Sequence, residues 1–306
     1  MRRYVVAVGL VVIVASCAND TTTPETTPET VPDTTSSTTS TSTTATTTTP
    51  TLPRLRTYHI GNSLTWDSLD FQPDATGYKV LARQADVIVE DGWHIKCGSS
   101  LSSIAAAPTD TCVDPKEPFG FYEDALSGFT WDAVTAQPYP GADSTLSTDI
   151  AFFQYLTDLT DGARLYVLAA WPPHTGYREA WTAPTSGDDP NTSLSAPYLD
   201  RLYQSLTGIC PGIGVVPTGE VLYELAADID LETLYRDELH LNEKGRFVAG
   251  VTLASVITGA DPHNLHKPNN WYGDSAEFSS EFQSLVQETV ARVITDNPRA
   301  NASGVC

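Results

Sequence analysis

The sequence Tyr58-His59-Ile60-Gly61-Asn62-Ser63-Leu64-Thr65-Trp66 contains the change from strand to helix around which the chain is organised. An apolar run ending at Ile60 predicts a β-strand, and Gly61-Asn62 predict a tight turn, because glycine and asparagine tolerate backbone conformations that other residues avoid. The residues after Ser63 can begin a helix, so this serine would lie where free N–H groups stabilise negative charge. That environment suits an activated serine nucleophile. Alternatively, Asn62 or Ser63 merely caps the helix.

A second stretch, Arg236-Asp237-Glu238-Leu239-His240-Leu241-Asn242, stands directly before a helical apolar pattern. Asp237 and His240 can place an imidazole over a serine while the carboxylate holds the other ring nitrogen. The carboxylate would fix the imidazole tautomer and stabilise the imidazolium that forms during proton transfer. On its own, an Asp-x-x-His pair more commonly reflects a surface histidine. Together with Ser63, it predicts a Ser-His-Asp triad.

The two stretches together resemble the SGNH (GDSL-type) hydrolase superfamily. That family has a Gly-Asn/Asp-Ser-Leu block near the start of its domain and an Asp-x-x-His block near the end, and both match here over roughly residues 54–260. The resemblance implies a three-layer α/β/α sandwich, flavodoxin-like, with a parallel sheet of about five strands. It also implies a serine esterase that uses Ser63, His240 and Asp237 and needs no cofactor.

The resemblance further implies three hydrogen-bond donors for an oxyanion: the Ser63 N–H, a glycine after the second strand and an asparagine after the third. Gly98 matches the glycine, although it could equally serve a turn. The asparagine is missing, because the third strand is followed by Ala136-Gln137-Pro138-Tyr139-Pro140. Gln137 could donate the same kind of hydrogen bond from a longer side chain, or it could lie buried and satisfy a loop. Loss of one such donor typically lowers turnover by about 10²–10³.

Strand and helix patterns alternate through the domain. We expect strands at Leu55–Ile60, Asp86–Ile95, Trp131–Ala136, Arg164–Trp171 and Ile213–Val216. We expect helices at 76–85, 147–160, 196–208, 219–228, 243–258 and 275–295, the last opened by the capping-box-like Asp274-Ser275-Ala276-Glu277. This alternation predicts a parallel sheet with helices on both faces. Ser63 would then lie at the carboxyl end of the first strand, where such sheets hold their sites.

The N-terminal residues predict export and a spacer. Residues 1–17 combine a basic start, a short apolar run and Val14-Ala15-Ser16-Cys17, which resembles a lipobox that makes Cys17 the lipidated residue; an ordinary secretory signal is the alternative. Residues 18–53 are rich in Thr, Ser and Pro and cannot bury enough apolar surface to fold, so they predict a disordered stalk. Residues 54–306 would form the hydrolase-like domain. We expect a lipid-anchored protein at the bacterial cell surface or in the periplasm.

Lipidation of Cys17 would leave four cysteines: Cys97, Cys112, Cys210 and Cys306. In an exported protein, four cysteines suggest two disulfides, with three possible pairings. Cys97–Cys112 and Cys210–Cys306 is the favoured pairing, since the first bond closes a short loop. The sequence contains no Cys-x-x-Cys spacing, so these cysteines are not expected to bind a metal.

Several residues near the two blocks are candidates for a substrate rim: Trp66, His94, Trp171 and His174. Tryptophan can stack on a sugar ring, but it more often packs in a core or at a rim. The stretch His263-Asn264-Leu265-His266 has no clear third ligand, so it is interpreted as a surface loop and no metal is expected.

The charge and the location narrow the range of partners. The formal net charge of −21 argues against nucleic acid or an anionic membrane surface as a partner. We expect a monomer that acts on a small-molecule or polysaccharide ester, in particular an acetyl ester on carbohydrate. A glycan O-acetyltransferase and a non-catalytic glycan-binding surface protein are the alternatives.

Overall fold

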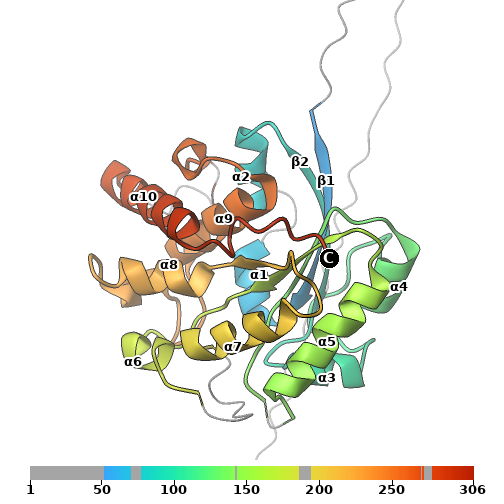
Figure 1. The fold of residues 1–306 in the computed structure, drawn as a ribbon. Helices are drawn as coiled ribbons and strands as arrows, with labels where there is room; N and C mark the ends of the chain where they lie inside the picture. Colours follow the sequence, from blue (N-terminus) through green and yellow to red (C-terminus); the bar gives the residue numbers. More distant parts are fainter. Residues whose placement is uncertain (1–51, 70–76, 142, 186–193, 270, 272–277) are drawn as a thin grey trace, which may run out of the picture. The chain divides into compact units, whose positions relative to one another are not determined.

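The computed structural model describes residues 52–306 other than 70–76, 142, 186–193, 270 and 272–277 (Figure 1). Its centre is a sheet of five strands: β1 (Arg54–Gly61), β2 (Ile88–Ile95), β3 (Ala133–Ala136), β4 (Arg164–Leu168) and β5 (Gly214–Val216). All neighbouring strands are parallel, and their order is β2-β1-β3-β4-β5. This order is that of flavodoxin-like sheets. The predicted fold class is confirmed.

The five strands lie where the sequence predicted them, with small differences at their ends. The second strand begins at Ile88 rather than Asp86, because Asp86 has a positive φ of 59° and cannot continue an extended chain. The fourth strand ends at Leu168, three residues before the predicted end at Trp171. Local apolar runs therefore located each strand to within a few residues.

Helices cover both faces of the sheet (Figure 1). One group packs around α9 and consists of α1 (Ser63–Leu69), α2 (Tyr78–Gln84), α8 (Thr218–Leu225), α9 (Glu243–Thr258) and α10 (Ser280–Asp296). The other group packs around α5 and consists of α3 (Leu101–Ala106), α4 (Tyr122–Gly128), α5 (Leu146–Leu159) and α7 (Ala196–Leu206). Adjacent side chains of β1 point to opposite layers. His59 contacts Tyr78 of α2, whereas Tyr58 donates to the carbonyl of Gly120, just before α4.

Most of the expected helices are present. The helix predicted at 275–295 begins only at Ser280, because the Ser279 hydroxyl caps it by accepting from the Phe282 N–H. The capping box proposed at 274–277 lies outside the described residues. Three short helices were not expected: α3, α4 and α6 (Tyr177–Trp181). The described residues also contain two 3₁₀ segments, Leu231–Leu234 and Pro262–Asn264.

Two disulfides join Cys97 to Cys112 and Cys210 to Cys306, in the pairing that the sequence favoured. The second bond holds the C-terminal segment beside the sheet, where the Leu165 N–H donates to the Gly304 carbonyl at 2.7 Å. Disulfides persist in oxidising compartments, so both bonds fit an extracellular or periplasmic protein. Within the described residues, no helix is long and apolar enough to cross a bilayer.

Candidate active site

The turn between β1 and α1 depends on a close approach at Gly61. A Cβ atom at this position would lie 2.1 Å from Thr65 Oγ1 and 2.9 Å from Gln137 Cβ, so only glycine fits. The left-handed backbone that the sequence suggested for Asn62 is not found; Asp86 is the one non-glycine residue with positive φ in the described chain. Asn62 instead uses its side chain: Oδ1 accepts from the Leu64 N–H at 3.0 Å, and Nδ2 donates to the Ser99 carbonyl at 3.2 Å. The turn that carries Ser63 is thereby tied to the loop after β2.

Gln137, at the end of β3, is fully buried beneath this turn. Its Oε1 accepts from the Thr65 N–H at 3.1 Å and the Thr65 hydroxyl at 2.7 Å, and its Nε2 donates to the Pro138 carbonyl at 3.3 Å. Of the two roles that the sequence left open for Gln137, the structure has the buried one. These hydrogen bonds connect the end of β3 to the start of α1.

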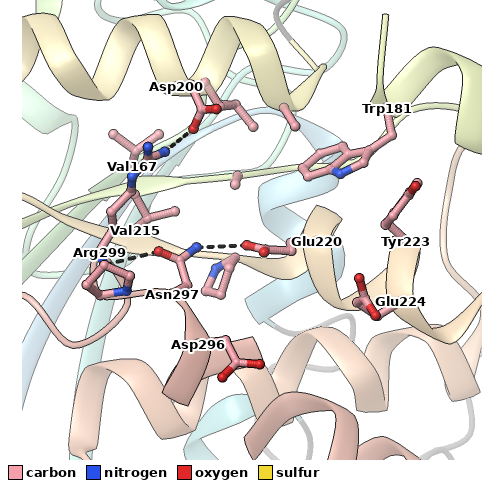
Figure 2. A pocket seen from close by; sticks show the side chains of 15 residues that line it. Val167, Trp181, Asp200, Val215, Glu220, Tyr223, Glu224, Asp296, Asn297 and Arg299 are labelled. Carbon is pink, nitrogen blue, oxygen red and sulfur yellow. Dashed lines mark hydrogen bonds and ion pairs between the residues drawn. The ribbon is translucent and has the colours of Figure 1, made fainter. Parts of the chain in front are cut away.

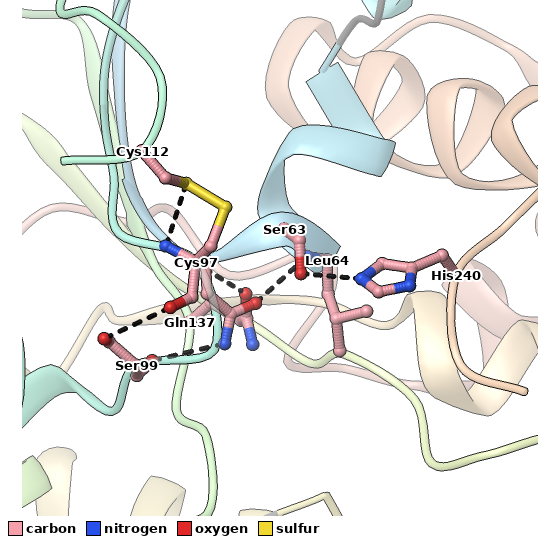
Figure 3. The surroundings of a disulfide bond; sticks show 8 residues. Ser63, Leu64, Cys97, Ser99, Cys112, Gln137 and His240 are labelled. Atoms are coloured by element: carbon pink, nitrogen blue, oxygen red, sulfur yellow. Dashed lines mark hydrogen bonds between the residues drawn. A yellow bond between two sulfur atoms is a disulfide. The ribbon is translucent and has the colours of Figure 1, made fainter. Parts of the chain in front are cut away.

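The side chains of Ser63, His240 and Asp237 meet at the carboxyl end of β1. Ser63 Oγ lies 2.8 Å from His240 Nε2 (Figure 3), and His240 Nδ1 lies 2.9 Å from Asp237 Oδ2. A hydrogen bond from Nδ1–H to the carboxylate leaves the Nε2 lone pair free to accept the proton of the serine. The imidazole is 28% exposed and the carboxylate 50% exposed, so the arrangement opens to solvent.

The carboxylate of Asp237 is held in its charged form. Its limited burial favours the neutral acid, but the N–H groups of His240 and Leu239 donate to Oδ1 at 2.8 and 2.9 Å, and the imidazole donates as well. These hydrogen bonds lower the pKa of Asp237 to about 2. At neutral pH the Asp237 carboxylate is therefore charged, and it accepts a hydrogen bond from His240 Nδ1–H.

The loop that carries Asp237 and His240 is held from the side of β4. The Trp171 indole N–H donates to the Leu239 carbonyl at 2.9 Å, and the His174 N–H donates to the Glu238 carbonyl at 3.0 Å. Trp171 is fully buried, so its expected place at a substrate rim is wrong. His174, also expected at the rim, is half-buried and packs beside Tyr235. Both residues support the loop, and the partly exposed side chain of His174 stays a candidate for the rim.

The other two rim candidates lie on opposite sides of the sheet. His94 is fully buried against Phe121 and Tyr122, and burial lowers its pKa to about 4, so its expected place at the rim is also wrong. Side chains alternate along a strand, so Trp93 points to the other face, where its ring meets Trp66 edge to face at 5.2 Å. Trp66 is half-buried one turn past Ser63 and stays a candidate for contact with a substrate.

Sequence reasoning missed a buried ionic cluster behind this loop. The side chain of Asp67 on α1 is fully buried, and Oδ1 accepts from Arg236 Nη1 at 2.9 Å and from Arg246 Nη2 at 2.6 Å. Its Oδ2 accepts from the Leu241 N–H at 2.9 Å. Asp67 and Arg236 are 169 positions apart, and no local motif links them.

Two backbone N–H groups near Ser63 have no acceptor within the described residues. The Asn62, Leu64 and Thr65 N–H groups all donate to side-chain oxygens, but the Ser63 N–H does not. The Gly98 N–H is likewise without an acceptor. Gly98 has a φ of +63° and directly follows Cys97 of the Cys97–Cys112 disulfide. Both groups are candidate donors to an oxyanion.

A separate cavity of about 380 Å³ lies between α7, α8 and the chain after α10 (Figure 2). None of Ser63, Asp237 and His240 lines it. Its polar side chains are largely paired with one another: Arg299 with Asp200, and Asn297 Nδ2 with Glu220 Oε2 at 2.7 Å. The cavity therefore presents few groups that are free to recognise a ligand.

The five-stranded parallel sheet, with Ser63 directly after β1 and Asp237 and His240 directly before α9, agrees with the α/β fold that the sequence predicted. No family model matches the chain, and no curated protein matches it in sequence.

Solved structures with similar folds were found at low sequence identity. A DUF4886 family protein from Bacteroides uniformis aligns with a TM-score of 0.58 and 15% identity, over 79% of this chain and 95% of that one. An acetylxylan esterase from Geobacillus stearothermophilus aligns with a TM-score of 0.48 and 14% identity, over 72% of this chain and 100% of that one. At these identities the likeness concerns the fold alone.

Proposed function

We propose that the protein is an exported serine esterase that hydrolyses carboxylic esters, in particular acetyl esters on carbohydrate or glycan. One observation carries the proposal: Ser63 Oγ lies 2.8 Å from His240 Nε2, while Asp237 holds the opposite ring nitrogen. A nucleophile within hydrogen-bonding reach of a base, which is itself oriented by a carboxylate, is the geometry that acyl transfer by serine requires.

In the proposed cycle, His240 Nε2 takes the proton of Ser63 as Oγ attacks the carbonyl carbon of the ester. The charge that develops on the carbonyl oxygen is stabilised by the N–H groups of Ser63 and Gly98. The imidazolium then protonates the departing alcohol, which leaves an acyl group on Ser63. Water deprotonated by His240 hydrolyses this acyl-enzyme and restores the serine. Asp237 remains a carboxylate throughout.

Gln137 acts indirectly in this mechanism. Its Oε1 fixes the Thr65 N–H at the start of α1, so it orients the helix that carries Ser63. The oxyanion hole then has two backbone donors and no amide side chain from the third strand. We therefore expect a turnover below that of an enzyme with three donors, since a single donor contributes about 10²–10³.

The substrate class follows from location and from the surface beside the serine. Residues 1–53 lie almost wholly outside the described part of the chain; in our proposal they supply a lipid anchor at Cys17 and a stalk that lifts the domain off a membrane. An anchored esterase outside the cell meets polysaccharides and glycans. Trp66, half-buried one turn past Ser63, offers an aromatic surface on which a sugar ring can stack.

The test compares the wild type with Ser63→Ala on p-nitrophenyl acetate and on acetylated oligosaccharides. We expect the substitution to reduce turnover to background while the circular dichroism spectrum and the melting temperature stay unchanged. Retained hydrolysis in a folded Ser63→Ala protein would end the proposal. Product analysis with an added sugar acceptor distinguishes hydrolysis from acetyl transfer, because only a transferase converts the acceptor into an ester.

A further inference from the structure

We infer that Asp67 is a positioning residue, which fixes the Asp237–His240 loop at the distance from Ser63 that proton transfer requires. The inference rests on the proposed esterase function and adds a residue that has no part in the triad. The side chain of Asp67 is fully buried, and it does not contact the reacting atoms.

The placement of its hydrogen bonds supports this role. Asp67 lies on α1, one turn past Ser63, so the short helix fixes the two residues relative to each other. Its carboxylate binds the loop on both sides of the catalytic pair: Oδ1 accepts from Arg236, the residue before Asp237, and Oδ2 accepts from the Leu241 N–H, directly after His240. The loop is thus anchored to the same helix that carries the nucleophile.

The two arginines at Asp67 have different tasks. Arg246 projects from α9 with its side chain only 6% exposed, and its Nε and Nη2 donate to Asp67 Oδ1 at 3.1 and 2.6 Å. This pair compensates a buried carboxylate that would otherwise be strongly destabilising. Arg236 belongs to the catalytic loop, and its side chain is 37% exposed. Arg246 therefore holds Asp67 in place against α9. Arg236 binds the same carboxylate from within the loop that carries Asp237 and His240.

A weakened anchor should affect turnover more than substrate affinity. Without the carboxylate, the loop can shift while the fold persists, and a misplacement of about 1 Å at a reacting group lowers the rate by up to roughly 10²-fold. A residue that matters only for folding would lower stability and leave the turnover of each folded molecule unchanged. The separation of kcat from KM and from stability therefore distinguishes the two roles.

The first experiment measures kcat, KM and melting temperature of Asp67→Asn with p-nitrophenyl acetate. We expect kcat to fall roughly 10- to 100-fold, with KM within about twofold of the wild-type value. The matched control is Asp91→Asn, because Asp91 is also a buried carboxylate, 1% exposed and paired with Lys79 and Lys116, but lies on β2 away from the loop. The control should lower the melting temperature and leave kcat unchanged.

A second variant keeps the inference testable if Asp67→Asn does not fold. Arg236→Gln changes a partly exposed side chain, so folding should tolerate it, and we expect a loss in kcat of the same order. The double variant should lose less than the product of the two single losses, since Asp67 and Arg236 are bound to each other. If folded Arg236→Gln and folded Asp67→Asn both keep the wild-type kcat, the inference about Asp67 is overturned, and the proposed function still stands. A wild-type protein without esterase activity would overturn the proposed function, and this inference with it.

Discussion

Two buried aspartates, one on each face of the sheet, are bound in opposite ways. Asp67, on the α9 side, accepts hydrogen bonds from two guanidinium groups and one backbone N–H. Asp149, on the α5 side, accepts one hydrogen bond, from the Tyr198 hydroxyl at 2.7 Å, and its Oδ1 has no partner within the described residues. Burial raises the pKa of Asp149 to about 7.

The difference lies in how many hydrogen-bond donors surround each buried carboxylate. A buried carboxylate with a full set of donors can act as a rigid anchor, and Asp67 connects the elements that carry Ser63 and His240. A buried carboxyl group with one unpaired oxygen is destabilising, and among the described side chains the Tyr198 hydroxyl is the one donor to Asp149. In the proposed mechanism, Asp67 therefore has a part in holding the reacting groups, and Asp149 has none.

The largest expected effect concerns the carboxylate of the triad itself. Asp237→Asn keeps the shape of the side chain but removes the acceptor that selects the imidazole tautomer, so we expect turnover to fall by roughly 10⁴-fold. Steady-state kinetics on p-nitrophenyl acetate checks this. Because the pKa of Asp237 is about 2, its titration should leave the activity of the wild type unaffected at neutral pH. Near-normal turnover in the variant would remove Asp237 from the mechanism.

The contrast between the two faces predicts unequal effects of the same substitution. Asp67→Asn should reduce kcat roughly 10- to 100-fold, whereas Asp149→Asn should leave kcat within about twofold of the wild type. Both variants are assayed under identical conditions after their folding has been verified. Equal losses of kcat in the two variants would show that the faces do not differ as described.

The role of Gln137 can be separated by two substitutions at the same position. Gln137→Glu keeps an oxygen to accept from Thr65, and Gln137→Ala does not. We expect the alanine variant to lose roughly tenfold in turnover and about 1–3 kcal/mol of stability, because the buried Thr65 N–H loses its acceptor. The glutamate variant keeps this acceptor and should retain more turnover, but it loses the donor to the Pro138 carbonyl and buries an ionisable group, so its stability should fall as well. Unchanged turnover in a folded Gln137→Ala protein would show that Gln137 does not orient the helix that carries Ser63.

The last prediction concerns stability rather than turnover: the free energy of unfolding should depend on pH through Asp149. Its folded-state pKa of about 7 exceeds the unfolded value of 3.8, so its stabilising contribution is complete below pH 3.8 and is lost as pH rises through about 7. Asp149→Asn has no such loss. Relative to the wild type, the variant should therefore gain free energy of unfolding between about pH 4 and pH 8, at up to about 1.4 kcal/mol per pH unit. Urea unfolding at several pH values measures this, and a constant difference would contradict it.

The features that were predictable from sequence are those encoded locally. Apolar runs located the five strands, and the blocks around Ser63 and His240 identified residues that the structure brings together. The short helices α3, α4 and α6 escaped prediction because they contain only five to seven residues, too few for a clear periodicity.

The features that the sequence did not predict depend on contacts between distant parts of the chain. Trp93 and His94 are neighbours, yet the pleat sends them to opposite faces, and the sequence does not say which face holds the serine. Trp171 was expected at a rim, but its indole instead donates to Leu239 of a loop 68 positions later. The pairing of Asp67 with Arg236 and Arg246 left no local signal, because each residue alone resembles an ordinary surface charge.

The central claim is that Ser63 is a nucleophile activated by His240. Its most direct test is reaction with a serine-reactive phosphonate, followed by mass-spectrometric mapping of the adduct. We predict an adduct on the peptide that contains Ser63, no adduct in Ser63→Ala, and much slower labelling in His240→Ala. An adduct on a different serine, with Ser63 unmodified while ester hydrolysis is blocked, would contradict the account.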